Sequence, residues 1–361
     1  MAGAGYRTFQ SGEVLTSNNV QTYLMDQAVQ VYAGTAARAS AVPSPSTGMV
    51  AYSTATGLQV YNGTAWVNAG AEASITVNYL VVGGGGSGGG SSASNGLGGG
   101  GGSGGMTCSV TASGGGAAAM SAISVAKSTN YACQVAAGGA ANTTNKVGNM
   151  GNTSFFAGVL AVGGGGGGTH STALNRNGLV GASGGGVPQN GLGVADAPAG
   201  LGSQGYAGGY SHSPGSNISG AGGGGTSAVG ANTSGNNPGA GGNGTASSIT
   251  GASVTYGGGG GGACHPSGTV NASGGTGGGG AGMTAAGGAP VAGSANTGGG
   301  GGGGGNTDEN GAAGGSGVII LSFPTTSGTI TIGAGLTGST TTSGANTIAT
   351  ITAGSGNVSW A

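Results

Sequence analysis

The pattern of large apolar residues changes twice along the chain. Up to about residue 72 these residues recur at helical or alternating spacing, whereas from about Ser74 they give way to Gly, Ala, Ser, Thr and Asn. Large apolar residues return near residues 318–323, and a Thr- and Ser-rich tail follows. We therefore expect three domains, at residues 1–73, 74–324 and 325–361.

The first of these regions predicts a small helix and a β-meander. Thr16 or Ser17 is a suitable cap for a helix over Ser17–Val31, whose apolar residues fall on one stripe: Val20, Tyr23, Leu24, Ala28 and Val31. The prolines of VPSPS end this helix. Residues 48–67 then alternate as strands do, with turn chemistry at Thr56-Gly57 and Asn62-Gly63.

Two apolar segments bracket the glycine-rich region. SITVNYLVV, which begins at Ser74, leads directly into a glycine run, and VIILSF follows Gly317 where the glycine-rich region ends. We expect these two strands to pair and to close the domain. In the tail, Ile330 alternates with Ile332, and Ile348 with Thr350, which predicts a short C-terminal β element.

The glycine runs predict a bundle of polyglycine II helices. They are contiguous and irregularly spaced, which excludes collagen: Gly83–Gly86, Gly98–Gly102, Gly163–Gly168, Gly222–Gly225, Gly257–Gly262, Gly277–Gly280 and Gly298–Gly305. A three-residue-per-turn helix without side chains accepts neighbours on every side, and its free N–H and C=O groups can bond between helices. The expected fold class is therefore mostly irregular and β, with this bundle at its centre.

Composition leaves disorder as the alternative. The chain has 98 Gly and 9 Pro among 361 residues, and ordering so many glycines costs on the order of 100–200 kcal/mol. Disordered chains are normally kept solvated by charge. This chain has only five Lys and Arg and six Asp and Glu, and none of them lies between Ala197 and Thr307. We therefore favour an ordered backbone that satisfies its own hydrogen bonds.

The low charge also excludes classes of partner. Five scattered cations cannot form the footprint that nucleic acid requires, and they give no attraction to anionic membranes. No segment is apolar enough to predict a membrane span, and the N-terminus has no apolar core of a secretory signal peptide. Cys108, Cys133 and Cys264 cannot all pair and match no zinc spacing, so we expect free thiols.

No complete catalytic constellation is present, and we expect neither an enzyme nor a cofactor or metal. G-x-G-x-x-G recurs only because Gly is abundant, and no Gly-Lys pair exists for a phosphate loop. Among the acids of the glycine-rich region only Asp308 and Glu309 are neighbours, and they are more typical of a solvated loop tip than of a glycosidase pair. Cys264-His265 is adjacent in sequence, which rarely brings two side chains together.

The best candidates for recognition are bulky or polar residues that we place in loops between glycine runs. Aromatic rings flanked by hydroxyl and amide groups suit a glycan or a surface protein. The alternative is that these residues only cover the bundle ends. The candidates are Tyr206, Tyr210, His212, His170, Asn175, Arg176 and His265.

Two parts of the chain resemble phage proteins. NYLVVGGGGSGGG, LAVGGGGGG, VTYGGGGGG and GGSGVIILSF, over about residues 74–324, resemble the glycine-rich domain of phage tail fibres and tail-tip adhesins. FQSGEVLTSNNVQTYLMDQAVQVYAGTAAR, followed by PSPSTGMVAY and GLQVYNGTAWV, is similar to the opening of phage minor tail proteins. The second segment carries more weight because its composition is complex.

This resemblance implies a virion tail component, made in the host cytoplasm, that displays loops on a rigid scaffold for attachment to a host-surface protein or glycan. Residues 1–73 would be a region for virion attachment and oligomerisation that binds other tail or virion proteins, and the resembled family favours a homo-oligomer, most often a trimer. A virion structural or decoration protein without receptor contact stays open, because aromatic residues are few between the runs. A glycine-rich ice-binding protein is a more remote alternative.

Overall fold

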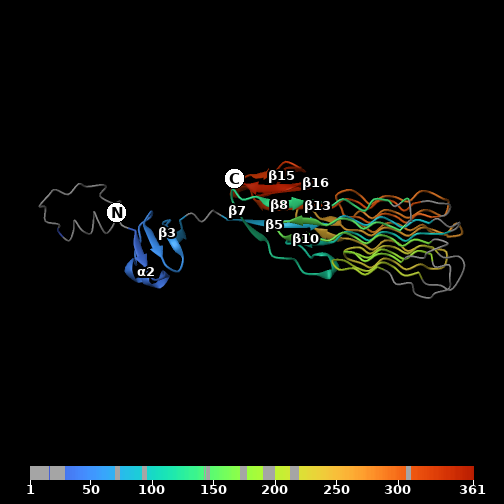
Figure 1. Ribbon diagram of the computed structural model, residues 1–361, viewed down its shortest axis with the longest axis horizontal. Coiled ribbons are helices and arrows are strands. Elements are labelled where there is room, and N and C mark those ends of the chain that lie inside the picture. Colours follow the sequence, from blue (N-terminus) through green and yellow to red (C-terminus); the bar gives the residue numbers. More distant parts are fainter. Residues whose placement is uncertain are drawn as a thin grey trace. The chain divides into compact units, whose positions relative to one another are not determined.

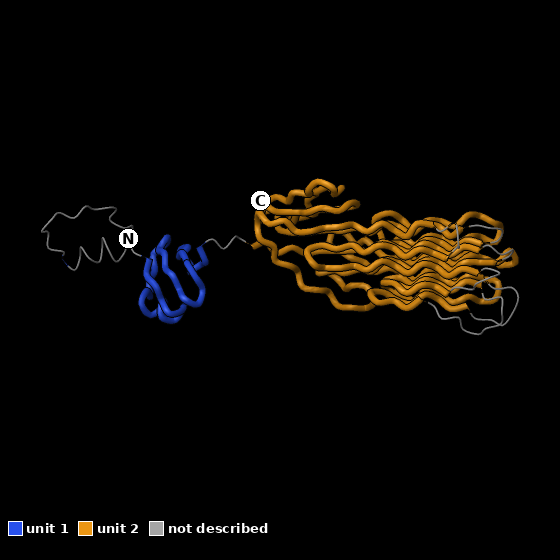
Figure 2. Tube along the Cα trace, in the orientation of Figure 1, with its two compact units in different colours: residues 1–73 blue, residues 74–361 orange. Residues whose placement is uncertain are grey.

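The computed structural model describes residue 16 and residues 29–69, 74–91, 96–141, 143, 147–170, 177–189, 200–211, 219–305 and 310–361. The chain forms two compact units, Met1–Ala73 and Ser74–Ala361 (Figure 2). The described residues are mostly β, with one α-helix among them. In these ranges no helix is both long and apolar enough to cross a membrane.

The first unit is a small four-stranded sheet with one short helix. Its elements are β1 (Gln30–Tyr32), α2 (Thr35–Ala41), β2 (Val50–Ser53), β3 (Gly57–Tyr61) and β4 (Trp66–Asn68). The order is β1-β2-β3-β4, with β1 parallel to β2 and the later pairs antiparallel. The predicted meander is confirmed, and its second turn is held by the Asn62 side chain, whose Oδ1 accepts from the N–H groups of Thr64 and Ala65.

The predicted helix over Ser17–Val31 lies mostly outside the described residues. Its predicted C-terminal end is wrong, because the last residues are in a strand. Gln30 and Val31 belong to β1, where Val31 lies opposite Tyr52 of β2. The physical reason is local alternation: residues 29–32 read Val-Gln-Val-Tyr, and β-branched residues favour a paired strand. The α-helix begins later, in the Ala-rich Thr35–Ala41.

The second unit is built on a barrel-like sheet. Its main path is β10 (Val159–Ala161), β9 (Ser154–Phe156), β8 (Tyr131–Gln134), β16 (Asn346–Trp360), β13 (Val318–Pro324), β5 (Ser74–Val82) and β6 (Met106–Cys108). Attached to it are β14 (Ile330–Ile332) and β15 (Leu336–Ser343), both paired with β16, and β7 (Ile123–Ala126), paired with β5. A separate hairpin joins β11 (Thr245–Ser247) to β12 (Val254–Tyr256), and 3-10 turns lie at Gly114–Gly116 and Thr325–Ser327.

The two bracketing strands pair as predicted. β5 and β13 are antiparallel, with Val82 opposite Val318, so the start and the end of the glycine-rich region lie together. The tail after Pro324 does not stand apart as a domain of its own. β16 is the antiparallel partner of β13, so the tail strands extend the same sheet within the second unit.

Both faces of the central strands are covered. Tyr79 and Val81 of β5 belong to a large cluster inside the barrel, which also holds Phe156, Phe323 and Trp360. The alternate residues of β5 and β13 join a second cluster with the β11–β12 hairpin, made of Leu80, Val82, Met106, Cys108, Ile249, Tyr256, Val318, Ile320 and Ile348. Burial on two faces explains the unbroken apolar runs in these strands.

The strands continue directly into the glycine segments. β5 leads into residues 83–91, residues 96–105 lead into β6, and residues 310–317 lead into β13. Figure 1 shows these segments side by side, extending away from the sheet as a bundle. The sheet therefore fixes one end of the bundle, and the turns between segments lie at both ends.

The aromatic cluster inside the barrel should dominate the stability of the second unit. Trp360 is 1% exposed, and its ring lies 5.9 Å from Tyr131, 6.4 Å from Phe156 and 5.8 Å from Phe323. We expect Trp360→Ala to lower the free energy of unfolding by roughly 3–5 kcal/mol because it leaves a cavity. Urea unfolding followed by circular dichroism measures this change. The control Val291→Ala, at a side chain 54% exposed, should change stability by less than about 0.5 kcal/mol.

Candidate functional site

The bundle is held together by hydrogen bonds between backbones, and they repeat every third residue. In the segment 83–89, each successive N–H donates to a different neighbouring segment, and the same neighbour recurs three residues later. Gly83, Gly86 and Gly89 donate to residues 105, 102 and 99; Gly84 and Ser87 donate to residues 152 and 149; Gly85 and Gly88 donate to residues 315 and 312. One extended segment therefore contacts three others through its donors alone.

The carbonyl groups add further neighbours. Within the segment 98–105, the N–H groups donate to segments 298–304, 162–168 and 221–224, while the C=O groups accept from segments 183–186, 260–263 and 83–89. This segment has six hydrogen-bonded neighbours. Such a surrounded segment has no free direction in which a side chain could point.

The glycines are required by this close packing. A Cβ built on Gly101 would collide with the backbone of Gly86, and one built on Gly260 would collide with the backbone of Gly301. At such approaches a backbone atom would have to move, since no flexible side chain can yield. The outer segments differ, because side chains there point to solvent. Val180, Val229 and Val291 are each more than half exposed.

His170 and His265 lie at the end of the bundle remote from the sheet. His170 ends the segment 162–169, where the Ser91 hydroxyl donates to its carbonyl at 2.6 Å. Its Nδ1 is buried without a hydrogen-bond partner, and burial lowers the pKa of its imidazole. An imidazole in this environment is neutral at pH 7 and contributes shape rather than charge.

His265 stabilises a turn. Its Nδ1 accepts from the Ser267 N–H at 3.1 Å, its carbonyl accepts from the Gly268 N–H at 2.7 Å, and its own N–H donates to the Ser219 hydroxyl. The neighbouring Cys264 thiol donates to the Val270 carbonyl at 3.1 Å. Both side chains are thus engaged with the backbone of the turn, and the structure brings no thiol–imidazole pair together.

Tyr206 and Tyr210 are not in a loop, so their placement from sequence is wrong. Residues 205–211 form a bundle segment, in which the Tyr206 N–H donates to Gly225 and the Tyr210 carbonyl accepts from Thr233. Tyr206 lies near the sheet, with its hydroxyl beside Gly116, and is partly exposed. Tyr210 lies further along and is 42% exposed. The sequence did not indicate this bundle segment, because residues 206–210, YAGGY, contain no long glycine run.

The backbone hydrogen bonds between segments place Tyr210 at the same end of the bundle as the two histidines. Gly209, beside Tyr210, is bonded to Val187, and Val187 is bonded to Ala221. Ala221 lies one residue from Gly220, which bonds to Ala263 next to the Cys264 turn. The structure therefore gathers His170, Tyr210 and His265 at the remote end and leaves Tyr206 apart. His212, Asn175 and Arg176 lie outside the described residues, as do Asp308 and Glu309.

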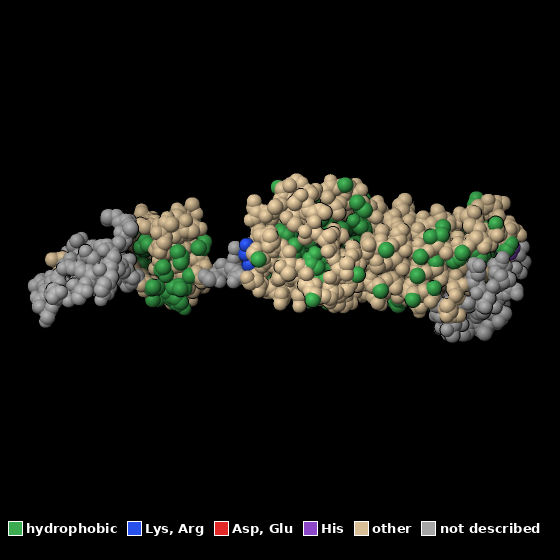
Figure 3. All heavy atoms as spheres, turned by 90° about the horizontal axis from the view of Figure 1, so that it is seen from above, with side chains coloured by type: hydrophobic (Ala, Val, Ile, Leu, Met, Phe, Trp, Pro, Cys, Tyr) green, Lys and Arg blue, Asp and Glu red, His purple; other side chains and the backbone are tan. Residues whose placement is uncertain are grey.

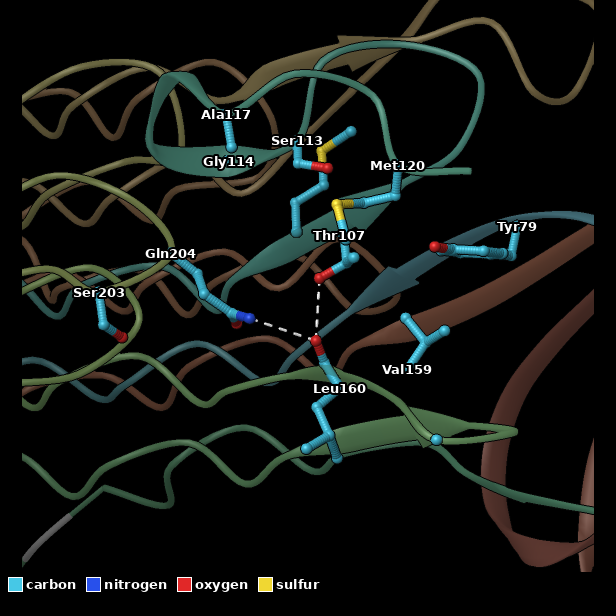
Figure 4. Close-up of a pocket in the computed structure, with 12 residues that line it drawn as sticks. Tyr79, Thr107, Ser113, Gly114, Ala117, Met120, Val159, Leu160, Ser203 and Gln204 are labelled. Carbon is cyan, nitrogen blue, oxygen red and sulfur yellow. Dashed lines mark hydrogen bonds between the residues drawn. The ribbon is translucent and has the colours of Figure 1, made fainter. Parts of the chain in front are cut away.

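A cleft that the sequence did not indicate lies where the two edges of the barrel-like sheet meet. Its volume is about 360 Å³, and its walls come from β6, β10 and the loop that holds Met120 (Figure 4). The Leu160 carbonyl of β10 accepts from the Thr107 hydroxyl at 2.9 Å and from the Gln204 amide at 3.2 Å, which joins the edges. Tyr79 points into it from β5. The sequence carried no signal for this junction between β6 and β10, because each strand has only three residues.

The described residues contain no group of three or more His, Cys, Asp or Glu that could hold a metal ion. All three cysteines are free and buried. Cys108 lies within 3.5 Å of the hydroxyls of Thr111 and Ser247. Burial raises the pKa of the Cys133 thiol to about 12 and also raises the pKa of Cys264. These two thiols are protonated at neutral pH and are poor nucleophiles.

We expect a single methyl group in the bundle interior to be destabilising. Gly101→Ala should lower the free energy of unfolding by about 1–3 kcal/mol or more, because the new Cβ meets backbone. Thermal unfolding of the full chain measures the loss. Gly288→Ala is the matched control, since its Cβ would approach only the side chain of Thr284 at an exposed turn. Equal stability of the two variants would contradict the close packing.

The raised pKa of Cys133 predicts its thiol reactivity. In the folded protein at pH 8 we expect Cys133 to resist a thiol-specific disulfide reagent, because its thiolate is scarce and its side chain is fully buried. In guanidinium chloride all three cysteines should react. Peptide mapping by mass spectrometry identifies the modified residue. Fast labelling of Cys133 without denaturant would show that the β8 region opens.

Comparison with known proteins identifies a family for most of the chain. A family model described as a glycine-rich domain matches residues 53–324, from the last residue of β2 to the last residue of β13. No curated protein matches the chain. The match covers most of the sequence, and its end coincides with the strand that closes the bundle. The chain belongs to the glycine-rich domain family.

Proposed function

We propose that this chain is a structural protein of a phage virion, a tail fibre or tail-tip adhesin, that displays the remote end of a rigid glycine bundle for attachment to a host surface. The observation that carries the proposal is the three-residue repeat of the backbone hydrogen bonds between bundle segments. It makes a stiff body with few charged residues, whose position and direction are fixed by the sheet at one end.

The finer structure that we assign to this body is a bundle of polyglycine II helices. Three features support it: the hydrogen-bond partner recurs every third residue, inner segments have six neighbours, and no residue of 98–102 or 163–168 has a positive φ. A helix of three residues per turn with negative φ has this periodicity. An eight-residue run would span roughly 25 Å at ~3.1 Å per residue.

The viral setting is supported by the resemblance of the N-terminal region to phage minor tail proteins. In this proposal residues 1–73 bind other tail or virion proteins, the chain assembles as a homo-oligomer with a trimer favoured, and the protein resides in the virion tail. Function as a scaffold requires no catalytic group.

The host-contact residues that we propose are those at the remote end of the bundle. His170, Tyr210 and His265 are held there by the bundle itself. Tyr210 is the best choice among them, because the residue is 42% exposed on a rigid segment and its ring offers contact area with a polar hydroxyl. His212, Asn175 and Arg176 remain candidates from sequence, and Tyr206 is a weaker one because it lies near the sheet.

Two alternatives keep the scaffold and change its use. A structural or decoration protein of the virion would need the bundle but no receptor contact, and the few aromatic residues of the bundle favour it. A glycine-rich ice-binding protein would use a flat face of the same bundle, and it leaves the virion-like N-terminal region without a role.

Cell binding tests the proposal. The labelled full-length protein should bind saturably to at least one strain in a panel of bacteria, as measured by flow cytometry. Tyr210→Ala should raise the apparent dissociation constant at least about tenfold, since loss of an aromatic hot-spot residue costs about 2 kcal/mol or more. Leu201→Ala, a change at a side chain 63% exposed that lies elsewhere on the bundle, is the control and should bind as the wild type does.

Electron microscopy separates the alternatives. Gold-labelled antibodies against the C-terminal strands β14, β15 and β16 should mark the tails of phage particles. Tail labelling with no saturable binding to cells would favour the purely structural role. Absence from particles would remove the viral proposal altogether.

A further inference from the structure

The first unit has one face of its sheet that is apolar and exposed. The register places Val31, Tyr52 and Leu58 in one row across β1, β2 and β3, and Val50, Val60 and Val67 in the next row across β2, β3 and β4. Five of these six residues are among the exposed large hydrophobics, from 38% for Val50 to 67% for Val31. Figure 3 shows hydrophobic side chains gathered over this unit. We call this surface, made of these six residues, the open face.

The opposite face carries buried polar residues beside Ala51, Tyr61 and Trp66. Arg38 of α2 is buried there, and its guanidinium donates to the Gln59 side chain and lies 4.7 Å from the centre of the Trp66 ring. The Gln59 amide donates in turn to Asn68 at 2.9 Å. Within residues 29–69 Arg38 is the one charged side chain, so the open face carries no charge.

The described part of the unit therefore has almost no hydrophobic core of its own. Among its described residues Ala51 is the one buried hydrophobic side chain. Domains of about this size normally need a disulfide, a metal or a partner chain to be stable. The three cysteines of the chain all lie beyond residue 73, and the described residues offer no metal cluster. The described residues thus hold no internal source for this core, and a partner chain can supply it.

We propose that the open face is an interface between copies of this chain, and that it provides the missing core of the first unit in the oligomer. A second copy fits the observations better than another protein does. Interfaces between identical subunits are more apolar than transient ones and are depleted in charge at their centre. An uncharged face has no repulsion against itself, and a copy is always present in equal amount. Leu58 and Tyr52, next to each other across β2 and β3, lie near its centre.

This inference gives a surface to the oligomerisation included in the proposed function, but it does not depend on the viral setting. Cell binding and self-association are measured separately. A monomer that binds cells would overturn this inference alone, and an oligomer that binds no cell would overturn the attachment role alone.

Sedimentation velocity of the full-length protein is the first test. We expect a mass that is a multiple of 32.4 kDa. Leu58→Lys should raise the dissociation constant of the oligomer at least about thirtyfold, as loss of a central interface residue does, because a charge would be buried without a partner. Leu201→Lys, on the exposed surface of the second unit, is the matched control and should leave the mass unchanged. A wild-type protein that sediments as a single chain at all concentrations would overturn the proposal.

Cross-linking tests the same interface without the Leu58→Lys change, which could itself unfold the first unit. Leu58→Cys should give covalent oligomers with a short bis-maleimide reagent, because the native cysteines are buried and the new thiol lies in the interface. Leu201→Cys should not. If Leu58→Cys gives no cross-linked product while the wild type is oligomeric, the chains associate elsewhere and the open face is not the interface. If residues 1–28 of the same chain cover the open face, Leu58→Cys should give no cross-linked product, or the wild type should be a monomer. Either outcome would overturn the proposal.

Discussion

The second unit depends on backbones approaching so closely that only glycine fits between them. In an ordinary domain side chains fill the interior and backbone hydrogen bonds follow from that packing. Here the hydrogen bonds themselves are the cohesive interaction, and they form because no Cβ keeps segments such as 83–89 and 98–105 apart. The loss of glycine entropy is offset by many short bonds that water cannot reach, since both segments are buried.

The barrel-like sheet solves a problem that the bundle cannot solve alone. Backbone bonds repeat every three residues, so a segment could slide along its neighbour and recover the same bonds in a new register. Side chains in the strands prevent this, because Val82 and Val318, immediately before and after the glycine segments, are buried together in one apolar cluster. The aromatic contacts of Trp360 with Phe156 and Phe323 hold the strands together inside the barrel. The sheet thus sets the register and the bundle extends it.

The sequence predicted those features that follow from local pattern. The pairing of the strands around Val82 and Val318 and the meander after Met49 were visible as apolar runs and turn residues. The junction between Thr107 and Leu160 was not, because it joins three-residue strands that are distant in sequence. Tyr206 and Tyr210 were misplaced because the outer segments of the bundle mix Ala, Ser and Asn with Gly, and that composition also describes loops. The integration of the tail depended on a partner strand, β13, which no local pattern identifies.

The network of neighbours also determines when the protein can fold. Gly85 bonds to Gly315 and Gly88 to Ala312, so the first segment of the body needs the last one as a partner. Contacts between residues so far apart make folding slow, because the closure of a long loop precedes any gain. During synthesis the early glycine segments must wait on the ribosome with open hydrogen-bonding groups and no charge to keep them apart. Slow translation or crowding of nascent chains would therefore favour pairing between copies before the sheet has closed.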